Sequence, residues 1–333
     1  MTEPLRGIGY DAGVLYETVF DSNPRFTEQG ARRDLRAIRR ELGCDAVLVM
    51  ASDPGRLRVA AGIAAEEGLE VWLQPRPFDR PVEELREAVQ AAATTAEGLR
   101  AAGAAAGLVV GCELTLSTPG LLPGPTFWTR AMLMAVTSPL LPIANRRLRR
   151  LLGDLVGDAR ERFAGPVSYG AGDWERPDWS VFDVVGADRY RDARNAWRFE
   201  DDTRALVQHA HRHGRPVYVF EFGSCTYRGA AARASTAAGV LRGRGEPTVP
   251  RHLRRDEQEQ ADYLTELLDT FDRCEVDGTF VWGFSEPALT TSDQPGRDLD
   301  LASYGVVSAH ADGTWTPKRA YHALAHRYRG SST

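Results

Sequence analysis

Residues 108–116, LVVGCELTL, and residues 216–224, PVYVFEFGS, decide the fold. Each is a short apolar run, rich in β-branched or aromatic residues, that includes a glutamate and continues into turn residues. Such runs are typical of buried parallel strands, whose carboxyl ends deliver side chains to a site built from loops. We therefore expect Glu113 and Glu221 to lie at the same end of a parallel sheet as a candidate catalytic pair.

Strand-like and helix-like runs alternate along the whole chain, which indicates repeated βα units. The pattern predicts eight strands, the number that closes a barrel, near 6–10, 45–50, 69–74, 107–113, 166–170, 182–187, 216–221 and 279–284. A doubly wound open sheet would require a glycine-rich phosphate turn after its first strand. The sequence there, YDAGVLYETVFDSNP, has no such motif. We predict an α/β protein, a single (β/α)8 TIM barrel spanning residues 1–333.

Three helices and two long connections stand out between these strands. Residues 27–42 begin with Thr27 as a possible cap, 81–102 begin with a proline, and 256–274 begin with acidic residues. The segments 114–126 and 222–255 are too long for simple connectors and follow predicted strands four and seven. Because both leave the carboxyl end of a strand, the active face of a barrel, we expect them to border the site, with 222–255 resembling a lid.

The most apolar segment is TFWTRAMLMAVTSPLLPIANRR, residues 126–147. Arg130, Pro139 and Pro142 lie within it and speak against a membrane-spanning helix. We interpret it as a buried helix and loop.

The charge and the cysteine content of the chain indicate which classes of partner to expect. The formal net charge of −5 provides no general field for nucleic acid or for an anionic membrane. The four cysteines show no spacing typical of metal ligands, and no charged-then-apolar leader opens the sequence. We expect a reduced, cytoplasmic protein that acts on a small molecule or carbohydrate, with no metal or other cofactor and with no nucleic acid or membrane partner. The oligomeric state is left open.

Two carboxyl groups are what glycoside hydrolysis requires: one protonates the leaving oxygen, and the other attacks or activates water. Glu113 and Glu221 are 108 residues apart, room for three ordinary βα units. In this arrangement the sequence resembles the clan A glycoside hydrolases. The resemblance implies that Glu113 is the acid/base and Glu221 the nucleophile of a retaining enzyme. It also implies that Tyr190, in GADRY, contacts the nucleophile and that Trp282, in GTFVWGF, is a platform for a sugar ring.

One position departs from that pattern. The clan usually has an asparagine before its acid/base to hold the sugar 2-hydroxyl, and Cys112 stands there in this chain. A thiol is a weak donor and acceptor, so the contact is lost or supplied by another group. An arginine is expected to keep Glu221 ionised, and both Arg76 and Arg189 are possible.

Further candidates lie at predicted strand ends. Asp11 in GIGYDAG either lines the site or caps a turn, and Gln74 and Arg76 in WLQPRP follow the third strand. Three more follow the fifth strand: Trp174 is flanked by the acids Asp173 and Glu175, and its indole either stacks on a sugar or packs within the loop. Glu286 in GFSEP either accepts a hydrogen bond from substrate or solvates its loop.

The chain also resembles bacterial barrel proteins labelled abortive infection protein. The resemblance rests on stretches spread over the sequence, which include GIGYDAG, SDPGRL, LEVWLQPRP, GCELTL with GLLPG, FEFGSCTYRGA, DLDLASYGVV and TWTPKRAYHALA. It implies the barrel architecture and names no substrate.

Two other functions stay open at this point. Cys112 and the arginine-bearing segment 222–255 fit a non-catalytic barrel that binds a carbohydrate or another ligand. An acid and a base at one site also serve isomerisation, cyclisation or dehydration of a metabolite, because a fold does not determine its chemistry.

Overall fold

Eight parallel strands follow one another around a barrel in the computed structural model, which describes residues 3–17, 19–243 and 246–330. All eight predicted strands are present, which confirms the predicted fold. Their bounds are β1 (Leu5–Asp11), β4 (Ala46–Ala51), β5 (Glu70–Pro75), β6 (Ala106–Cys112), β7 (Val167–Gly170), β8 (Val185–Asp188), β9 (Val217–Phe222) and β10 (Gly278–Val281).

The sheet order is β7-β6-β5-β4-β1-β10-β9-β8, so each strand pairs with its neighbours along the chain and β1 pairs with the last strand, β10. The remaining seam lies between β7 and β8. The backbone N–H of Asp188 donates to the carbonyl of Ala171 at 2.9 Å, and that of Ala171 donates to Gly186 at 3.3 Å. These bonds close the sheet at the end of the barrel that carries the predicted site.

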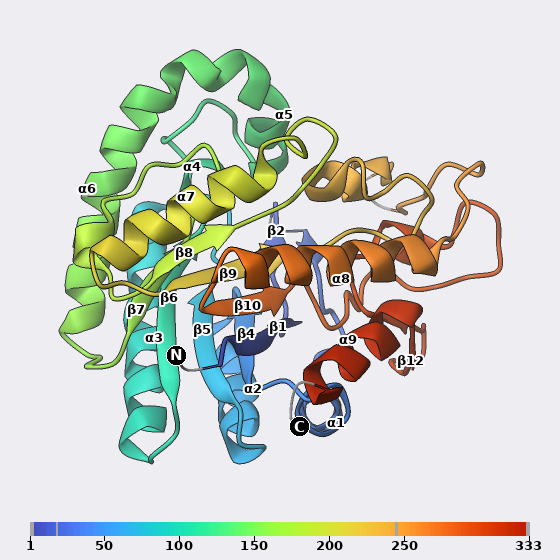
Figure 1. The fold of residues 1–333 in the computed structure, drawn as a ribbon, viewed down its shortest axis with the longest axis horizontal. Coiled ribbons are helices and arrows are strands. Elements are labelled where there is room, and N and C mark those ends of the chain that lie inside the picture. The colour runs from blue at the N-terminus through green and yellow to red at the C-terminus, as the bar shows by residue number, and fades with distance from the viewer. Residues whose placement is uncertain (1–2, 18, 244–245, 331–333) are drawn as a thin grey trace.

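Helices surround the strands (Figure 1). They are α1 (Glu28–Ala37), α2 (Pro54–Glu66), α3 (Val82–Ala101), α4 (Leu114–Ser117), α5 (Phe127–Thr137), α6 (Leu141–Arg160), α7 (Phe199–Arg212), α8 (Glu257–Arg273) and α9 (Arg319–Gly330). Short elements complete the fold: the hairpins β2 (Leu15–Tyr16) with β3 (Phe20–Asp21) and β11 (Val307–Ala309) with β12 (Trp315–Pro317), the π-helical turn η1 (Ile38–Leu42), and the 3-10 turns η2 (Ser138–Leu140), η3 (Trp179–Val181), η4 (Ala234–Val240) and η5 (Leu299–Ala302).

Side-chain caps fix where several helices begin. The Thr27 hydroxyl accepts the backbone N–H of Gly30 at 3.0 Å, as the sequence predicted. Asp256 accepts from Glu259 at 3.1 Å at the start of α8. Each cap satisfies a backbone donor that the first helical turn leaves without an internal partner.

Large side chains fill the barrel interior. Trp72, Phe220 and Phe280 are fully buried there, and their rings contact one another or neighbouring rings. Glycines make room for two of them: a Cβ at Gly107 would lie 2.6 Å from the Trp72 ring, and one at Gly7 would lie 2.3 Å from Phe280. The barrel is therefore packed solid beneath its mouth, and chemistry is confined to the carboxyl ends of the strands.

Both long connections leave the mouth of the barrel and carry structure of their own. Segment 114–126 starts with α4, and the segment after β9 contains η4. The latter forms a small apolar core in which Tyr227, Val240 and Tyr304 take part. It is thus a packed subassembly at the rim rather than an open loop. Residues 244–245 of the predicted lid lie outside the described residues.

The prediction of a buried helix within 126–147 is wrong in one respect. The helix is present as α5, but Met132 is 82% exposed and Val136 is 73% exposed. Its inner face packs on α4 and α6, whereas the outer face has no covering element among the described residues. The described part of the chain contains no helix that is both long and apolar enough to span a bilayer.

Candidate active site

Glu113 and Glu221 lie at the carboxyl ends of β6 and β9, which β7 and β8 separate around the barrel. Glu113 directly follows β6, where its N–H donates to the carbonyl of Gly170 at 2.9 Å, and Glu221 lies within β9. The backbone of Glu113 is left-handed, with φ of +43°. Non-glycine residues adopt this region at a cost, and such residues cluster at functional sites.

Glu221 sits among donors. Its carboxylate forms an ion pair with Arg76, accepts the Tyr190 hydroxyl at 3.3 Å, and lies 3.4 Å from the Cys112 sulfur. Arg76 is held in turn by Gln74, whose Oε1 accepts its Nε at 2.7 Å. The carboxylate is therefore fixed in position by one positive charge and by the Tyr190 hydroxyl.

The choice between two arginines is resolved by these contacts. Arg76 is 3% exposed, pairs with Glu221, and has its guanidinium 4.7 Å from the Trp282 ring centroid. Arg189 points elsewhere, to Asp173 at 2.6 Å and to Thr203 at 2.8 Å.

Glu113 has a different environment. Burial raises its pKa well above the ordinary value, and the charges of Asp188 and Glu221 raise it further, while Arg76 opposes them. A carboxyl group with a raised pKa holds its proton near neutral pH and can act as a general acid. The two glutamates therefore lie in different electrostatic environments.

Asp188, which the sequence analysis did not select, is a third carboxyl group in the same place. Its Oδ2 lies 3.6 Å from the Cys112 sulfur, and burial, followed by the charge of Glu221, raises its pKa well above the ordinary value. Oδ1 of Asp188 and Nε2 of Gln74 are buried without protein partners, and both adjoin the α-carbon of Gly170. Asp188 lies at the end of a strand, two residues before Tyr190, and this position in the sequence could have identified it as a site candidate.

Behind Glu113 a buried carboxylate holds the start of α4. Glu175 accepts the Thr115 N–H at 2.9 Å and the Tyr169 hydroxyl at 2.6 Å, and that hydroxyl accepts the Leu114 N–H at 2.8 Å. These bonds fix the two residues that follow Glu113. We therefore regard Glu175 and Tyr169 as positioning residues for the strained backbone at Glu113.

Asp173 and Trp174, the candidates that follow strand five, bind side chains other than Glu113 and Glu221. Trp174 donates its indole N–H to Thr115 at 2.8 Å and packs against the apolar cluster of Leu116 and Leu122. Trp174 therefore packs within the loop, and sugar stacking on its indole stays a proposal. Asp173 is exposed and pairs with Arg189.

Two further acidic candidates lie near the mouth and bind backbone. Asp11 accepts the Gly13 N–H at 2.8 Å and so caps a turn; burial raises its pKa, and the charge of Arg76 partly opposes this. Glu286 accepts the Tyr304 N–H at 2.7 Å, and burial raises its pKa to about 7. Both side chains therefore hold backbone in place. That they also bind substrate is a proposal, based on their position near the mouth.

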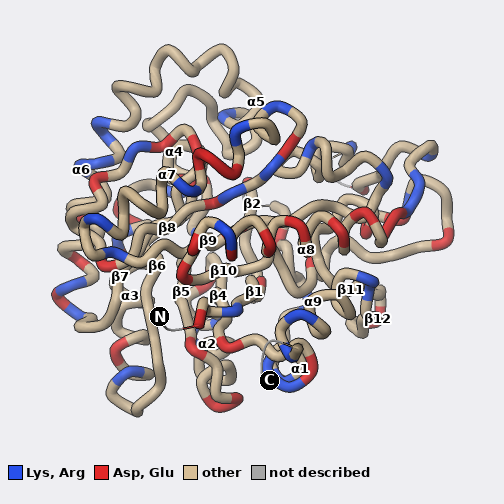
Figure 2. Tube along the Cα trace, viewed as in Figure 1, with Lys and Arg blue, Asp and Glu red and all other residues tan. Residues whose placement is uncertain are grey.

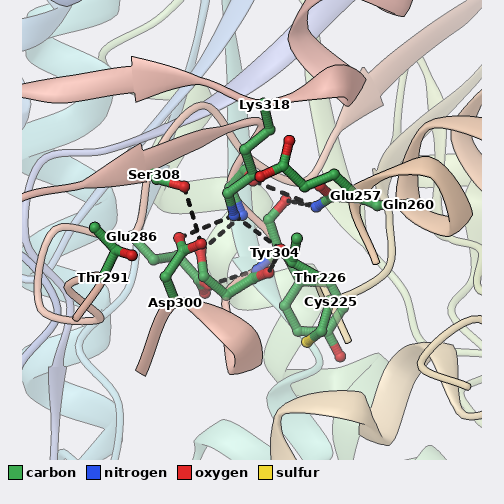
Figure 3. A network of polar contacts seen from close by, with 12 residues as sticks. Cys225, Thr226, Glu257, Gln260, Glu286, Thr291, Asp300, Tyr304, Ser308 and Lys318 are labelled. Atoms are coloured by element: carbon green, nitrogen blue, oxygen red, sulfur yellow. Dashed lines mark hydrogen bonds and ion pairs between the residues drawn. The ribbon is translucent and has the colours of Figure 1, made fainter. Parts of the chain in front are cut away.

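A buried ion pair lies at the part of the rim that holds Thr226 and Tyr304 (Figure 3). Lys318, the chain's one lysine, is 1% exposed and places its ammonium 2.9 Å from Asp300 and 2.9 Å from the Thr226 hydroxyl. Asp300 also accepts from Ser308 at 3.0 Å and from Arg255 at 2.7 Å. This network ties the connection after β9 to the C-terminal part of the chain.

Cys112, Asp188 and Glu221 are the described residues that could hold a metal ion, since one ligand atom of each lies within 4.8 Å of the others. The Arg76 guanidinium already contacts Glu221 in this cluster. A second cation there would face that guanidinium at short range, so we assign the neutralising charge to Arg76.

A hollow of about 610 Å3 lies elsewhere, between α1 and the β11–β12 hairpin. It has two acidic residues: Asp34 accepts bonds from Arg33 and from the Trp315 indole, each at 2.8 Å, and Asp312 accepts the Thr314 N–H at 2.9 Å. Its lining lacks Glu113 and Glu221. Chemistry rather than size therefore identifies the mouth of the barrel as the candidate active site.

No family model and no curated protein matches the sequence. Solved structures do match in fold, among them a GH113 β-1,4-mannanase with 18% identity and a TM-score of 0.63, over 98% of this chain and 99% of that one. The GH113 β-mannanase AaManA from Alicyclobacillus acidocaldarius shows 15% identity and a TM-score of 0.61, over 99% and 98%. A β-glucuronidase from Ruminococcus gnavus shows 14% identity and a TM-score of 0.58, over 98% of this chain and 49% of that one. At such identities the likeness defines the fold, a (β/α)8 barrel.

Proposed function

We propose that the protein is a retaining β-glycoside hydrolase or transglycosylase, with Glu113 as acid/base and Glu221 as nucleophile. One observation carries the proposal: two glutamates at strand ends of the barrel mouth lie in contrasting environments, near enough for the charge of Glu221 to raise the pKa of Glu113. Glu221 is bound by Arg76 and Tyr190, whereas the pKa of Glu113 is raised by burial and by neighbouring carboxylates. Retaining enzymes require one carboxylate that attacks the anomeric carbon and one acid that protonates the leaving oxygen.

The catalytic cycle follows from these roles. Glu221 attacks the anomeric carbon while Glu113 gives its proton to the departing oxygen, which produces a glycosyl ester on Glu221. Glu113, now ionised, takes a proton from an incoming water or alcohol, which releases the sugar with its original anomeric configuration. Arg76 and Tyr190 hold Glu221 during the attack, and the Trp282 indole lies beside them as a surface for the sugar ring.

Similar folds suggest where to begin the search for a substrate. The structural relatives include β-mannanases and β-glucuronidases, so aryl β-mannosides and β-glucuronides are the first compounds to assay. Cys112 and Asp188 occupy the wall where the clan's asparagine would bind a sugar hydroxyl, which favours a sugar that differs at that position. The relationship to proteins labelled abortive infection protein remains a proposal, and that label does not identify a reaction.

Glu221→Ala tests the proposal. We expect kcat/KM on the accepted glycoside to fall by roughly a thousandfold or more, and we expect added azide to restore turnover with an α-glycosyl azide as product. Glu113→Ala with azide should give the β-glycosyl azide, because its nucleophile is intact. Glu66→Gln on α2, an exposed glutamate paired with Arg32, is the matched control and should retain full activity. Unchanged kcat/KM in Glu221→Ala would contradict the assignment.

Asp188 favours a second candidate, proton-transfer chemistry on a metabolite. A buried carboxyl group with a raised pKa and an unpartnered oxygen can exchange a proton with a bound substrate without a covalent step. In that case Asp188→Asn would abolish turnover, and azide would rescue neither glutamate variant. A barrel that only binds its ligand would bind one of the compounds tightly but would convert none of them.

A further inference from the structure

The outer face of α5 and the beginning of α6 form an exposed apolar surface. We define the apolar arch as residues 127–143, which stand above the barrel in Figure 1. Nine large apolar side chains are exposed among the described residues, and six of them belong to the arch. They are Trp128, Met132, Leu133, Val136, Leu140 and Ile143. Single exposed apolar residues are ordinary, but a contiguous group of this kind marks an interaction surface.

The spacing of these side chains gives the surface its shape. Trp128, Met132 and Val136 are four residues apart, so they form one stripe along α5. The opposite side of the helix carries the packed residues, including Phe127 and Arg130. The stripe is therefore a property of the folded helix, which separates an inner packed face from an outer apolar one.

The charge next to the arch has one sign. Residues 114–153 contain no aspartate or glutamate, whereas a stretch of that length in this chain would hold between five and six on average. Arg146, Arg147, Arg149 and Arg150 of α6 are exposed and form no described ion pair. Arg130 is the one charged residue of the arch and is buried on its inner side, and Figure 2 shows basic residues on α6 below the arch.

We propose that the apolar arch and these four arginines dock on the surface of an anionic lipid bilayer. An apolar helix face enters the boundary between headgroups and acyl chains, and arginines beside it bind anionic headgroups. A second copy of the chain fits less well. A twofold contact through the arch would bring both arginine clusters to one interface, and the segment has no acid to pair with them.

The arch adjoins the mouth of the barrel. Trp128 stacks on Tyr16 with ring centroids 5.7 Å apart, and Tyr16 contacts Phe78, which Arg76 approaches to 5.9 Å. Docking would therefore hold the candidate active site close to the lipid surface. The overall net charge of −5, which argued against anionic membranes, conceals this local basic and apolar face.

Co-sedimentation of the full chain with lipid vesicles tests the proposal. We expect binding to vesicles in which about a third of the lipid is phosphatidylglycerol, and much weaker binding to pure phosphatidylcholine. Met132→Glu with Val136→Glu should abolish it, while Trp197→Ser, which removes an equally exposed aromatic residue away from the arch, should leave it unchanged. Arg146→Gln with Arg150→Gln should lower the partition coefficient by roughly tenfold or more; the exposed controls Arg58→Gln with Arg212→Gln should change it little.

A fluorescent label provides a second measurement that does not depend on removing the surface. All four native cysteines are buried, so Leu140→Cys can be labelled selectively with an environment-sensitive dye. Anionic vesicles should shift its emission to the blue, and the same dye at Val181→Cys should not respond. Absence of binding, binding that ignores the glutamate substitutions, or light scattering that shows a dimer dissociated by those substitutions would each overturn the proposal.

Discussion

Arg76→Met, combined with Glu221→Gln in a double-mutant cycle, tests the arrangement at the centre of the site. The Arg76 side chain is 3% exposed and that of Glu221 is 9% exposed, so each charge depends on the other for compensation. Removing one partner of a buried pair leaves the other charge uncompensated and costs about 3–5 kcal/mol of unfolding free energy. Removing both leaves neither charge of the pair uncompensated by the other, and the remaining cost comes from the Gln74 oxygen that loses its donor.

That remaining cost sets the expected size of the coupling. A buried acceptor without a partner costs about 1–3 kcal/mol, so the double variant should lose about that amount. The two single losses together should exceed the double loss by at least about 3 kcal/mol. Urea unfolding followed by circular dichroism measures all four proteins. Arg100→Met with Glu97→Gln, a partly exposed pair on α3 at 2.6 Å, is the control and should show almost no coupling. Additive losses at Arg76 and Glu221 would refute the buried pair.

Three further predictions concern charged groups around the mouth. Glu286 has a folded pKa of about 7 against an ordinary value of 4.5, so between these pH values the folded chain holds more protons than the unfolded one. The free energy of unfolding should therefore decrease by at most about 3 kcal/mol as the pH rises through this range. In unfolding experiments at pH 5 and pH 8, Glu286→Gln should not show this decrease. Lys318→Met should cost about 2–4 kcal/mol, because it leaves a buried carboxylate with fewer partners, and its exposed neighbour variant Arg319→Met should cost almost nothing in the same assay. Asp188→Asn removes a charge that raises the pKa of Glu113, so the basic limb of the pH–kcat/KM profile should move to lower pH; an unmoved limb would show that the two groups do not interact.

Much of the barrel could be predicted because each strand is short, apolar and buried on both faces. The positions of Glu113, Glu221 and Arg76 followed from strand ends, since the carboxyl ends of parallel strands meet at one mouth. The choice of Arg76 over Arg189 could not follow in this way. Both arginines come just after strand ends, and only the folded structure shows that one side chain turns inward while the other reaches Asp173.

Two features escaped the sequence analysis for different physical reasons. Asp188 shares a strand end with Tyr190, but one sequence does not show which acids lose their solvent, and burial is what makes this one unusual. The segment 126–147 was expected to be buried because it is apolar. Hydrophobicity predicts that a helix face will be covered, but it does not say whether the cover is the chain itself or another surface.

Trapping the glycosyl-enzyme tests the central claim most directly. A panel of activated 2-deoxy-2-fluoro β-glycosides, including the mannoside and the glucuronide, is incubated with the protein, and digested peptides are analysed by mass spectrometry. The proposed mechanism predicts one added fluoroglycosyl group per chain, located on the peptide that contains Glu221 and absent from Glu221→Gln. Turnover of the matching glycoside without any adduct, or an adduct on a residue other than Glu221, would contradict it.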